Sequence, residues 1–222
     1  MKSKKSILVD SSYNYILNNK MRLVACIFFS SVIFTSFLIS KSRLSEYYYG
    51  FGYAMVDGGA SGDVEGTLLN LSATNPASDS ADFVLSFNYG NIEALNADNT
   101  SWELGLDYVF HYDDYLYQNG MFRPFGGFGI SYLDDGAKIR MADDGFTWKI
   151  IGGIEILFTD YFSMSLGANF LGLLADLGQN DFTVDVGLTW WVNEVHGVAI
   201  EYNHAFDQEM NFIGLKYLYS WQ

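Results

Sequence analysis

The stretch WELGLDYVFHY, residues 102–112, decides the fold. Large apolar or aromatic side chains occupy its six even positions, while Glu, Gly, Asp, Val and His fill the odd ones. Successive side chains of a β-strand point to opposite faces of a sheet. The stretch therefore predicts a long strand with one aromatic face and one mostly small or polar face.

The same alternation recurs in eight other segments: 47–55, 83–90, 122–132, 146–158, 163–170, 181–192, 198–203 and 213–221. A soluble sandwich or barrel also alternates. However, the apolar face here is unusually aromatic, and the opposite face carries small residues and charges of both signs. Most segments are also longer than the soluble mode of about 5–6 residues. These features favour a transmembrane β-barrel, whose strands have one lipid face and one lumen face.

Nine segments do not fit a bacterial single-chain barrel, which has an even number of strands. A weaker segment, residues 66–72, places Thr67, Leu69 and Leu71 on one face. Including it predicts an all-β, up-and-down antiparallel barrel of ten strands over residues 46–222, with eight strands as the alternative. Periplasmic turns then fall near 73–80, 113–120, 159–161 and 193–196. Extracellular loops fall near 57–65, 91–100, 134–145, 174–180 and 207–210.

Aromatic residues near the segment ends predict the two interfacial belts that membrane barrels carry. The periplasmic belt comprises Tyr47, Tyr49, Phe110, Tyr112, Trp190 and Trp221, and the outer belt comprises Trp102, Tyr132 and Trp148.

Residues 1–45 are predicted to be an N-terminal extension and signal peptide. Lys20 and Arg22 precede an apolar stretch, residues 23–39, as in a secretory signal. Translation from Met21 instead of Met1, lipidation at Cys26 and an uncleaved anchor are alternatives, and residues 40–42 offer only a weak cleavage site.

Charge is distributed unevenly along the chain. The first 43 residues hold 7 of the 12 basic residues and one acid, which leaves 5 basic and 25 acidic residues and a formal charge of −20. Such a body excludes nucleic-acid binding through phosphate contacts. We expect outer-membrane lipids and cation-bridged lipopolysaccharide as partners, and a monomer.

Two stretches resemble the small outer-membrane β-barrel family, the porin-like group with eight to ten strands. They are RPFGGFGISY at 123–132 and GGIEILFTD at 152–160. The resemblance covers most of residues 46–222 and implies a bacterial outer-membrane location. It also implies that Leu215, Tyr217, Tyr219 and Trp221 are the signal read by the barrel assembly machinery, although Gln222 follows the final aromatic residue. It specifies architecture rather than activity.

The predicted lumen face carries charges of both signs: Glu103, Asp107, Arg123, Lys149, Glu155, Asp185, Glu201 and Lys216. Unpaired charges are costly in a narrow, poorly solvated space, so a salt-bridge network is one interpretation. The other is a narrow pore that passes small solutes or cations, because acids outnumber bases.

No catalytic residue, metal site or cofactor is predicted. His204, near Asp207 and Glu209, is the sole candidate for an enzyme at the outer rim, since His111 and His196 fall toward the periplasmic end. The acidic stretch 57–65 matches no defined calcium loop and is interpreted as a solvated turn; the acids at 134–135 and 143–144 are interpreted in the same way. A structural or interaction role, a narrow porin and an outer-rim enzyme thus remain as functional hypotheses, in that order.

Overall fold

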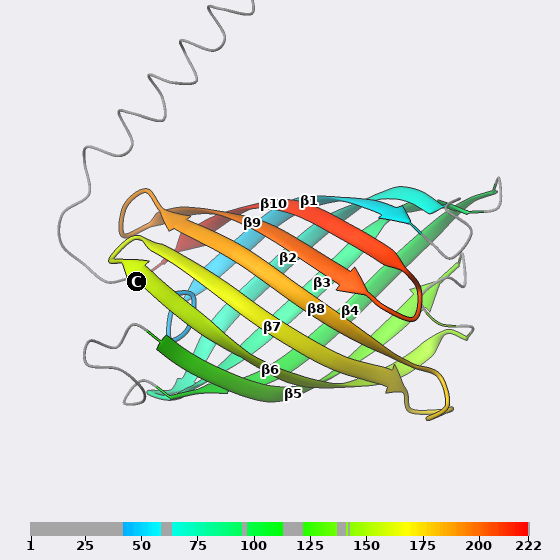
Figure 1. The fold of residues 1–222 in the computed structure, drawn as a ribbon, viewed down its shortest axis with the longest axis horizontal. Helices are drawn as coiled ribbons and strands as arrows, with labels where there is room; N and C mark the ends of the chain where they lie inside the picture. Colours follow the sequence, from blue (N-terminus) through cyan, green and yellow to red (C-terminus); the bar gives the residue numbers. More distant parts are fainter. Residues whose placement is uncertain are drawn as a thin grey trace, which may run out of the picture. The chain divides into compact units, whose positions relative to one another are not determined.

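The computed structural model describes residues 42–58, 64–94, 97–112, 122–136, 141 and 143–221. These residues form a single closed antiparallel barrel in which each strand pairs with its chain neighbours and the first strand pairs with the last (Figure 1). The predicted fold class and strand number, ten, are confirmed, and the eight-strand alternative is wrong. The strands are β1 Tyr48–Gly58, β2 Val64–Ser78, β3 Ala81–Ala94, β4 Ala97–His111, β5 Phe122–Asp135, β6 Gly145–Thr159, β7 Phe162–Leu173, β8 Asn180–Trp191, β9 His196–Ala205 and β10 Met210–Ser220.

Strand β2 is the segment that the sequence signals most weakly. Residues 66–72 lie mostly in its first half, and the strand spans 15 residues, about twice the length of the predicted segment. Its later outward positions hold Ala73 and Asn75 rather than large apolar residues, so the alternation fades there. Pro76 also suggests an end, because proline cannot donate to the ladder. The strand continues past it with a register shift between Pro76 and Ser78.

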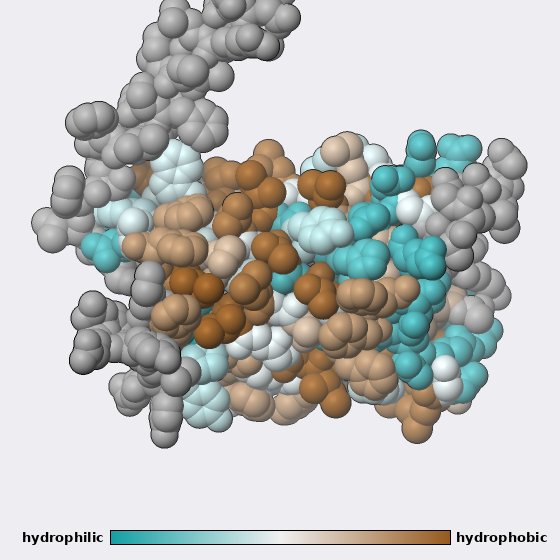
Figure 2. Space-filling view, viewed as in Figure 1, coloured by the Kyte–Doolittle hydropathy of each residue, from teal (hydrophilic) through white to brown (hydrophobic). Residues whose placement is uncertain are grey.

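The two faces of each strand differ sharply in exposure. On β4, Leu104 and Leu106 are 47% and 43% exposed, whereas Asp107 and His111 on the opposite face are 8% and 0% exposed. Figure 2 shows hydrophobic residues over the middle of the barrel wall and hydrophilic residues gathered at the end away from the C-terminus. The barrel is thus apolar outside and polar inside, the reverse of a soluble protein and the arrangement of a membrane barrel. None of the described residues forms a helix long and apolar enough to cross a membrane.

Short turns join β2 to β3, β6 to β7 and β8 to β9 at the end of the barrel that also holds Ser42 and Trp221. We assign this end to the periplasm, because periplasmic turns of such barrels are short. At this end Tyr49 stacks on Trp221 with ring centroids 4.0 Å apart. Toward the other end Trp102 stacks on Tyr132 at 5.4 Å. The remaining residues of the two expected belts, Tyr47, Phe110, Tyr112, Trp148 and Trp190, also lie on outward positions.

Replacing Leu85 by Arg tests the lipid-facing assignment. Leu85 lies midway along the outer face of β3, where a charge meets the bilayer core, and we expect a loss of about 2–4 kcal/mol in unfolding free energy. Asn91→Arg is the matched control, on the same face of the same strand near its outer end, with an expected cost of about 0–1 kcal/mol. Urea unfolding in lipid vesicles measures both, and equal costs would contradict the assignment.

Candidate functional site

The eight charged residues predicted for the lumen all occupy inward positions of their strands. The structure brings Lys149 Nζ within 2.6 Å of Asp107 Oδ2, and Lys216 Nζ within 2.8 Å of Glu201 Oε2. Glu103 accepts a hydrogen bond from Ser131 Oγ at 2.8 Å. Asp185 accepts bonds from the side-chain amides of Asn169 and Asn203. Arg123 lies opposite Glu155 in the register of β5 and β6.

The Lys149–Asp107 pair depends on a glycine between its two strands. Asp107, Gly129 and Lys149 are successive partners across β4, β5 and β6, so the ion pair forms over Gly129. A Cβ at Gly129 would stand 1.9 Å from Asp107 Oδ1. The absence of a side chain at this position is therefore what lets charges on non-adjacent strands meet.

Residues 42–46, here called the N-terminal segment, contact the lumen wall, which the sequence analysis did not predict. The sequence prediction groups residues 42–45 with the signal segment, yet in the structure they contact residues of the lumen wall. In the sequence, Arg43 is one of several basic residues that flank the apolar stretch 23–39. An irregular segment has no periodicity from which its direction could be predicted. Asp82, its partner on β3, directly precedes the predicted strand at 83–90 and was likewise missed.

One side of the N-terminal segment binds the wall formed by β6, β7 and β9. Ser42 Oγ donates a hydrogen bond to Glu155, which also accepts one from Ser163. Arg43 Nη1 lies 2.8 Å from Glu201 Oε1, and its guanidinium lies 6.0 Å from the centroid of the Tyr48 ring. Burial would lower the pKa of Arg43, but its interactions with Tyr48 and Glu201 outweigh burial and raise it, so the side chain keeps its charge.

The other side of the N-terminal segment binds β3 and β4. The Ser45 amide donates to Asp82 Oδ2 at 3.1 Å, and Ser45 Oγ lies 3.1 Å from His111 Nε2. Ser45 has a φ of 65°, in the left-handed region that non-glycine residues rarely adopt, and this conformation turns the chain inward before β1. The same Nε2 lies 3.6 Å from Asp82. A catalytic triad instead needs the carboxylate on the other ring nitrogen.

Above the N-terminal segment the lumen contains a chamber of about 300 Å³. Its polar lining includes Glu103, Lys149, Asp185, Glu201 and Asn203. An apolar cluster of inward residues lies near the outer ends of the strands, and three of its members, Leu68, Ala205 and Met210, also line the chamber. The full cluster comprises Val56, Val64, Leu68, Ile92, Ala205 and Met210. The barrel interior is thus layered, with a polar centre and more tightly packed ends.

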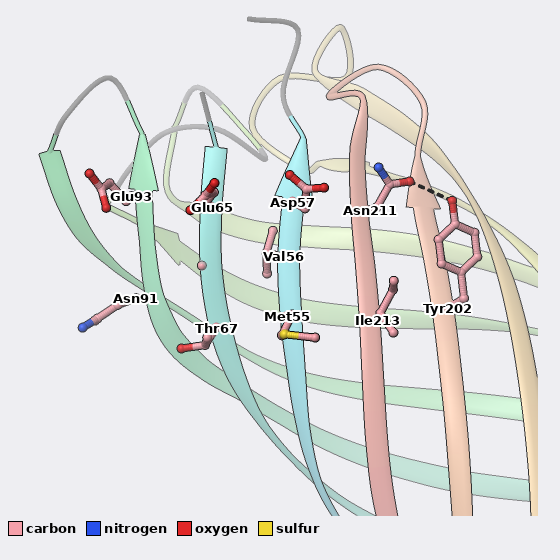
Figure 3. Close-up of a pocket in the computed structure, with 11 residues that line it drawn as sticks. Met55, Val56, Asp57, Glu65, Thr67, Asn91, Glu93, Tyr202, Asn211 and Ile213 are labelled. Atoms are coloured by element: carbon pink, nitrogen blue, oxygen red, sulfur yellow. Dashed lines mark hydrogen bonds between the residues drawn. The ribbon is translucent and has the colours of Figure 1, made fainter. Parts of the chain in front are cut away.

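A second hollow, of about 920 Å³, lies on the outside of the barrel near its extracellular end. Figure 3 shows Asp57, Glu65 and Glu93 side by side on β1, β2 and β3, where they are register partners. Tyr202 Oη donates to Asn211 Oδ1 at 2.7 Å on its other flank. Within the described ranges, no group of three or more His, Cys, Asp or Glu residues is placed to hold a metal ion.

His204, the sequence candidate for catalysis, contacts an amide. Its Nδ1 lies 2.9 Å from Asn211 Oδ1, and its ring meets Phe206 edge-on at 4.6 Å. The other outer-rim acids of the hypothesis, Asp207 and Glu209, lie in the β9–β10 turn.

Removing Lys149 tests the pairing across Gly129. We expect Lys149→Met to lower the unfolding free energy by about 1–3 kcal/mol, because Asp107 would stay buried without its cation. The double variant Asp107→Asn with Lys149→Met should regain most of that loss. Unfolding midpoints from the heat-modifiable gel shift complete the cycle, and independent, additive effects would contradict the pairing.

Comparison with known proteins bears on the fold. No protein-family model and no curated protein matches the chain. Among solved structures, an outer membrane channel from Pseudomonas putida F1 is similar over 84% of this chain and 97% of its own, with a TM-score of 0.53 and 6% identity. A KdgM porin in complex with disordered oligogalacturonate covers 79% of this chain and 99% of its own, with a TM-score of 0.43 and 11% identity. The Neisserial surface protein NspA covers 79% and 97%, with a TM-score of 0.40 and 12% identity.

At sequence identities this low, the similarity supports the fold and not a shared function. The closed barrel and its apolar outer face supply the location, since such a surface is stable only in lipid. The chain is thus a closed, ten-stranded antiparallel β-barrel with the fold and the apolar outer face of bacterial outer-membrane barrels.

Proposed function

We propose that the protein has a structural or interaction role in the outer membrane, with a charged, closed lumen and acidic extracellular surfaces. The observation that carries the proposal is the N-terminal segment, which bridges opposite walls of the periplasmic mouth. Ion pairs between lumen charges on adjacent or next-neighbour strands lie along the wall and add paired, bulky side chains to the lumen. A barrel filled in this way serves as a rigid mount for its outer rim rather than as a conduit.

A narrow porin is the second candidate, and the central chamber favours it. Four carboxylates, those of Glu103, Asp181, Asp185 and Glu201, line the chamber with a single ammonium, that of Lys149. Such an excess selects small cations over anions.

No enzymatic activity is proposed. The imidazole of His204 contacts an amide, and that of His111 is fully buried with both Ser45 and Asp82 at the same nitrogen. Because His111 is fully buried, its imidazole is not in reach of a substrate in this structure.

The proposed partners follow from the outer surface. The carboxylates of Asp57, Glu65 and Glu93 line the outer hollow (Figure 3) and give this part of the surface a negative charge. Divalent cations in the surrounding solvent, rather than at a built metal site, would link this surface to lipopolysaccharide phosphates. Leu215, Tyr217, Tyr219 and Trp221 share the outward side at the C-terminal end, which is available to the barrel assembly machinery. The barrel closes without a second copy, in keeping with a monomer.

Single-channel recording in planar lipid bilayers tests the proposal. We expect the full chain to give no conductance steps, because the N-terminal segment fills the periplasmic mouth. The heat-modifiable gel shift of the same preparation serves as the control that the barrel is folded. Regular cation-selective steps from folded protein would instead establish the narrow porin.

A further inference from the structure

The N-terminal segment is anchored to the lumen at three separate walls. Ser42 binds Glu155 on β6, Arg43 binds Glu201 on β9, and Ser45 binds Asp82 on β3 and approaches His111 on β4. We propose that this segment is a releasable stopper, with Arg43 as its latch, and that its release opens the acidic chamber to cations from the periplasm. The inference rests on the proposed closed lumen.

Inward side chains are deeply buried at the periplasmic mouth. His111, Asp82 and Trp191 are inaccessible to solvent, and Tyr48, Ala199 and Leu218 pack with Trp191 into a buried cluster. Lumen charges above it are different, since the side chains of Lys149 and Glu201 are 28% and 33% exposed. The N-terminal segment thus contacts buried side chains at the mouth, whereas the charges of the chamber are more exposed.

Arg43 occupies a cation site built into the wall. Its guanidinium has Glu201 at 2.8 Å and the Tyr48 ring at 6.0 Å. Its Nη1 also lies against Gly187, where an added Cβ would stand at an ordinary contact distance of 3.7 Å. Planar guanidinium groups suit carboxylate and aromatic partners of this kind.

The contacts that hold the segment are of a kind that can be broken. It precedes β1 and takes no part in the strand ladder, so its release leaves every strand pair intact. The Arg43 side chain is 20% exposed, and its partner Glu201 also binds Lys216. Glu201 therefore keeps a cation when Arg43 leaves, which lowers the cost of an unpaired charge.

Release would change what the chamber can take up. Loss of Arg43 removes one positive charge from beside Glu201, one of the four carboxylates that line the chamber with Lys149. The local field then favours small cations more strongly, and they enter from the side that the segment had closed. Cations, rather than anions or neutral sugars, are thus the class of ligand admitted.

A cysteine placed in the chamber reports this opening directly. Ser86 lines the chamber from β3, and Ser86→Cys in a Cys26→Ser background provides a single thiol. We expect an alkylammonium methanethiosulfonate to modify it at least roughly tenfold faster when Arg43 is replaced by Ala, a factor equal to about 1.4 kcal/mol. An anionic sulfonate reagent of similar size should gain less.

Three controls make the result decisive. Arg43→Lys keeps the charge and should modify nearly as slowly as the parent. Asp107→Asn with Lys149→Met removes an ion pair that does not touch the segment and should also stay slow. The heat-modifiable gel shift confirms that each variant is folded.

Equal rates in the parent and Arg43→Ala, with both folded, would overturn the stopper. Should Arg43→Ala fail to fold, Ser45→Pro gives the second test, because it removes the amide that bonds Asp82 and disfavours the φ of 65°. A fast parent would contradict the closed lumen, which separates failure of the proposed function from failure of the stopper.

Discussion

The hydrogen bonding of the backbone in lipid is the constraint on which the rest of the structure depends. The bilayer core offers no water to an exposed amide or carbonyl, so a sheet in it must close on itself. Here the closure is the antiparallel pairing of β1 with β10, which continues for eleven residue pairs from Tyr48 with Ser220 to Gly58 with Met210. Once the sheet is closed, every side chain must face either lipid or lumen, and the composition of each face follows.

The lumen then sets its own requirement, because ten strands leave a space that must be filled or hydrated. The centre of the lumen holds a chamber lined by paired charges and amides, such as Asp107 with Lys149 and Asp185 with two asparagines. The periplasmic mouth holds the N-terminal segment of the chain itself. The wall is closed by the strand ladder, whereas the proposed closure of the lumen depends on side-chain contacts outside that ladder.

The sequence predicts the strands of the barrel wall far better than the side-chain contacts inside the lumen. Alternation such as that at 102–112 predicts nine of the strands, because every second residue faces lipid. The requirement for an even number of strands then predicts β2. Partners inside the lumen depend on register, which alternation does not supply. The pairing of Asp107 with Lys149 needed two register assignments and a glycine between them.

Irregular segments escape such prediction altogether. Arg43 enters the lumen through the turn at Ser45, whose φ of 65° no residue pattern signals. Its target, Glu201, lies on a strand far along the chain and could be recognised as an inward charge but not as its partner. The sequence therefore predicted the acidic residues of the candidate site but not Arg43, which contacts them in the structure.

Trp190 and Trp191 offer the most direct test that neighbouring residues face lipid and lumen. Trp190 lies on the outward side of β8, whereas Trp191 is fully buried in the lumen beside Tyr48. Two variants, each retaining one of these tryptophans with the other four replaced by Phe, would be inserted into vesicles of brominated phospholipid. The account predicts strong fluorescence quenching of Trp190 and weak quenching of Trp191, because bromine quenches at close range. Equal quenching of the two would contradict the alternation on which the barrel rests.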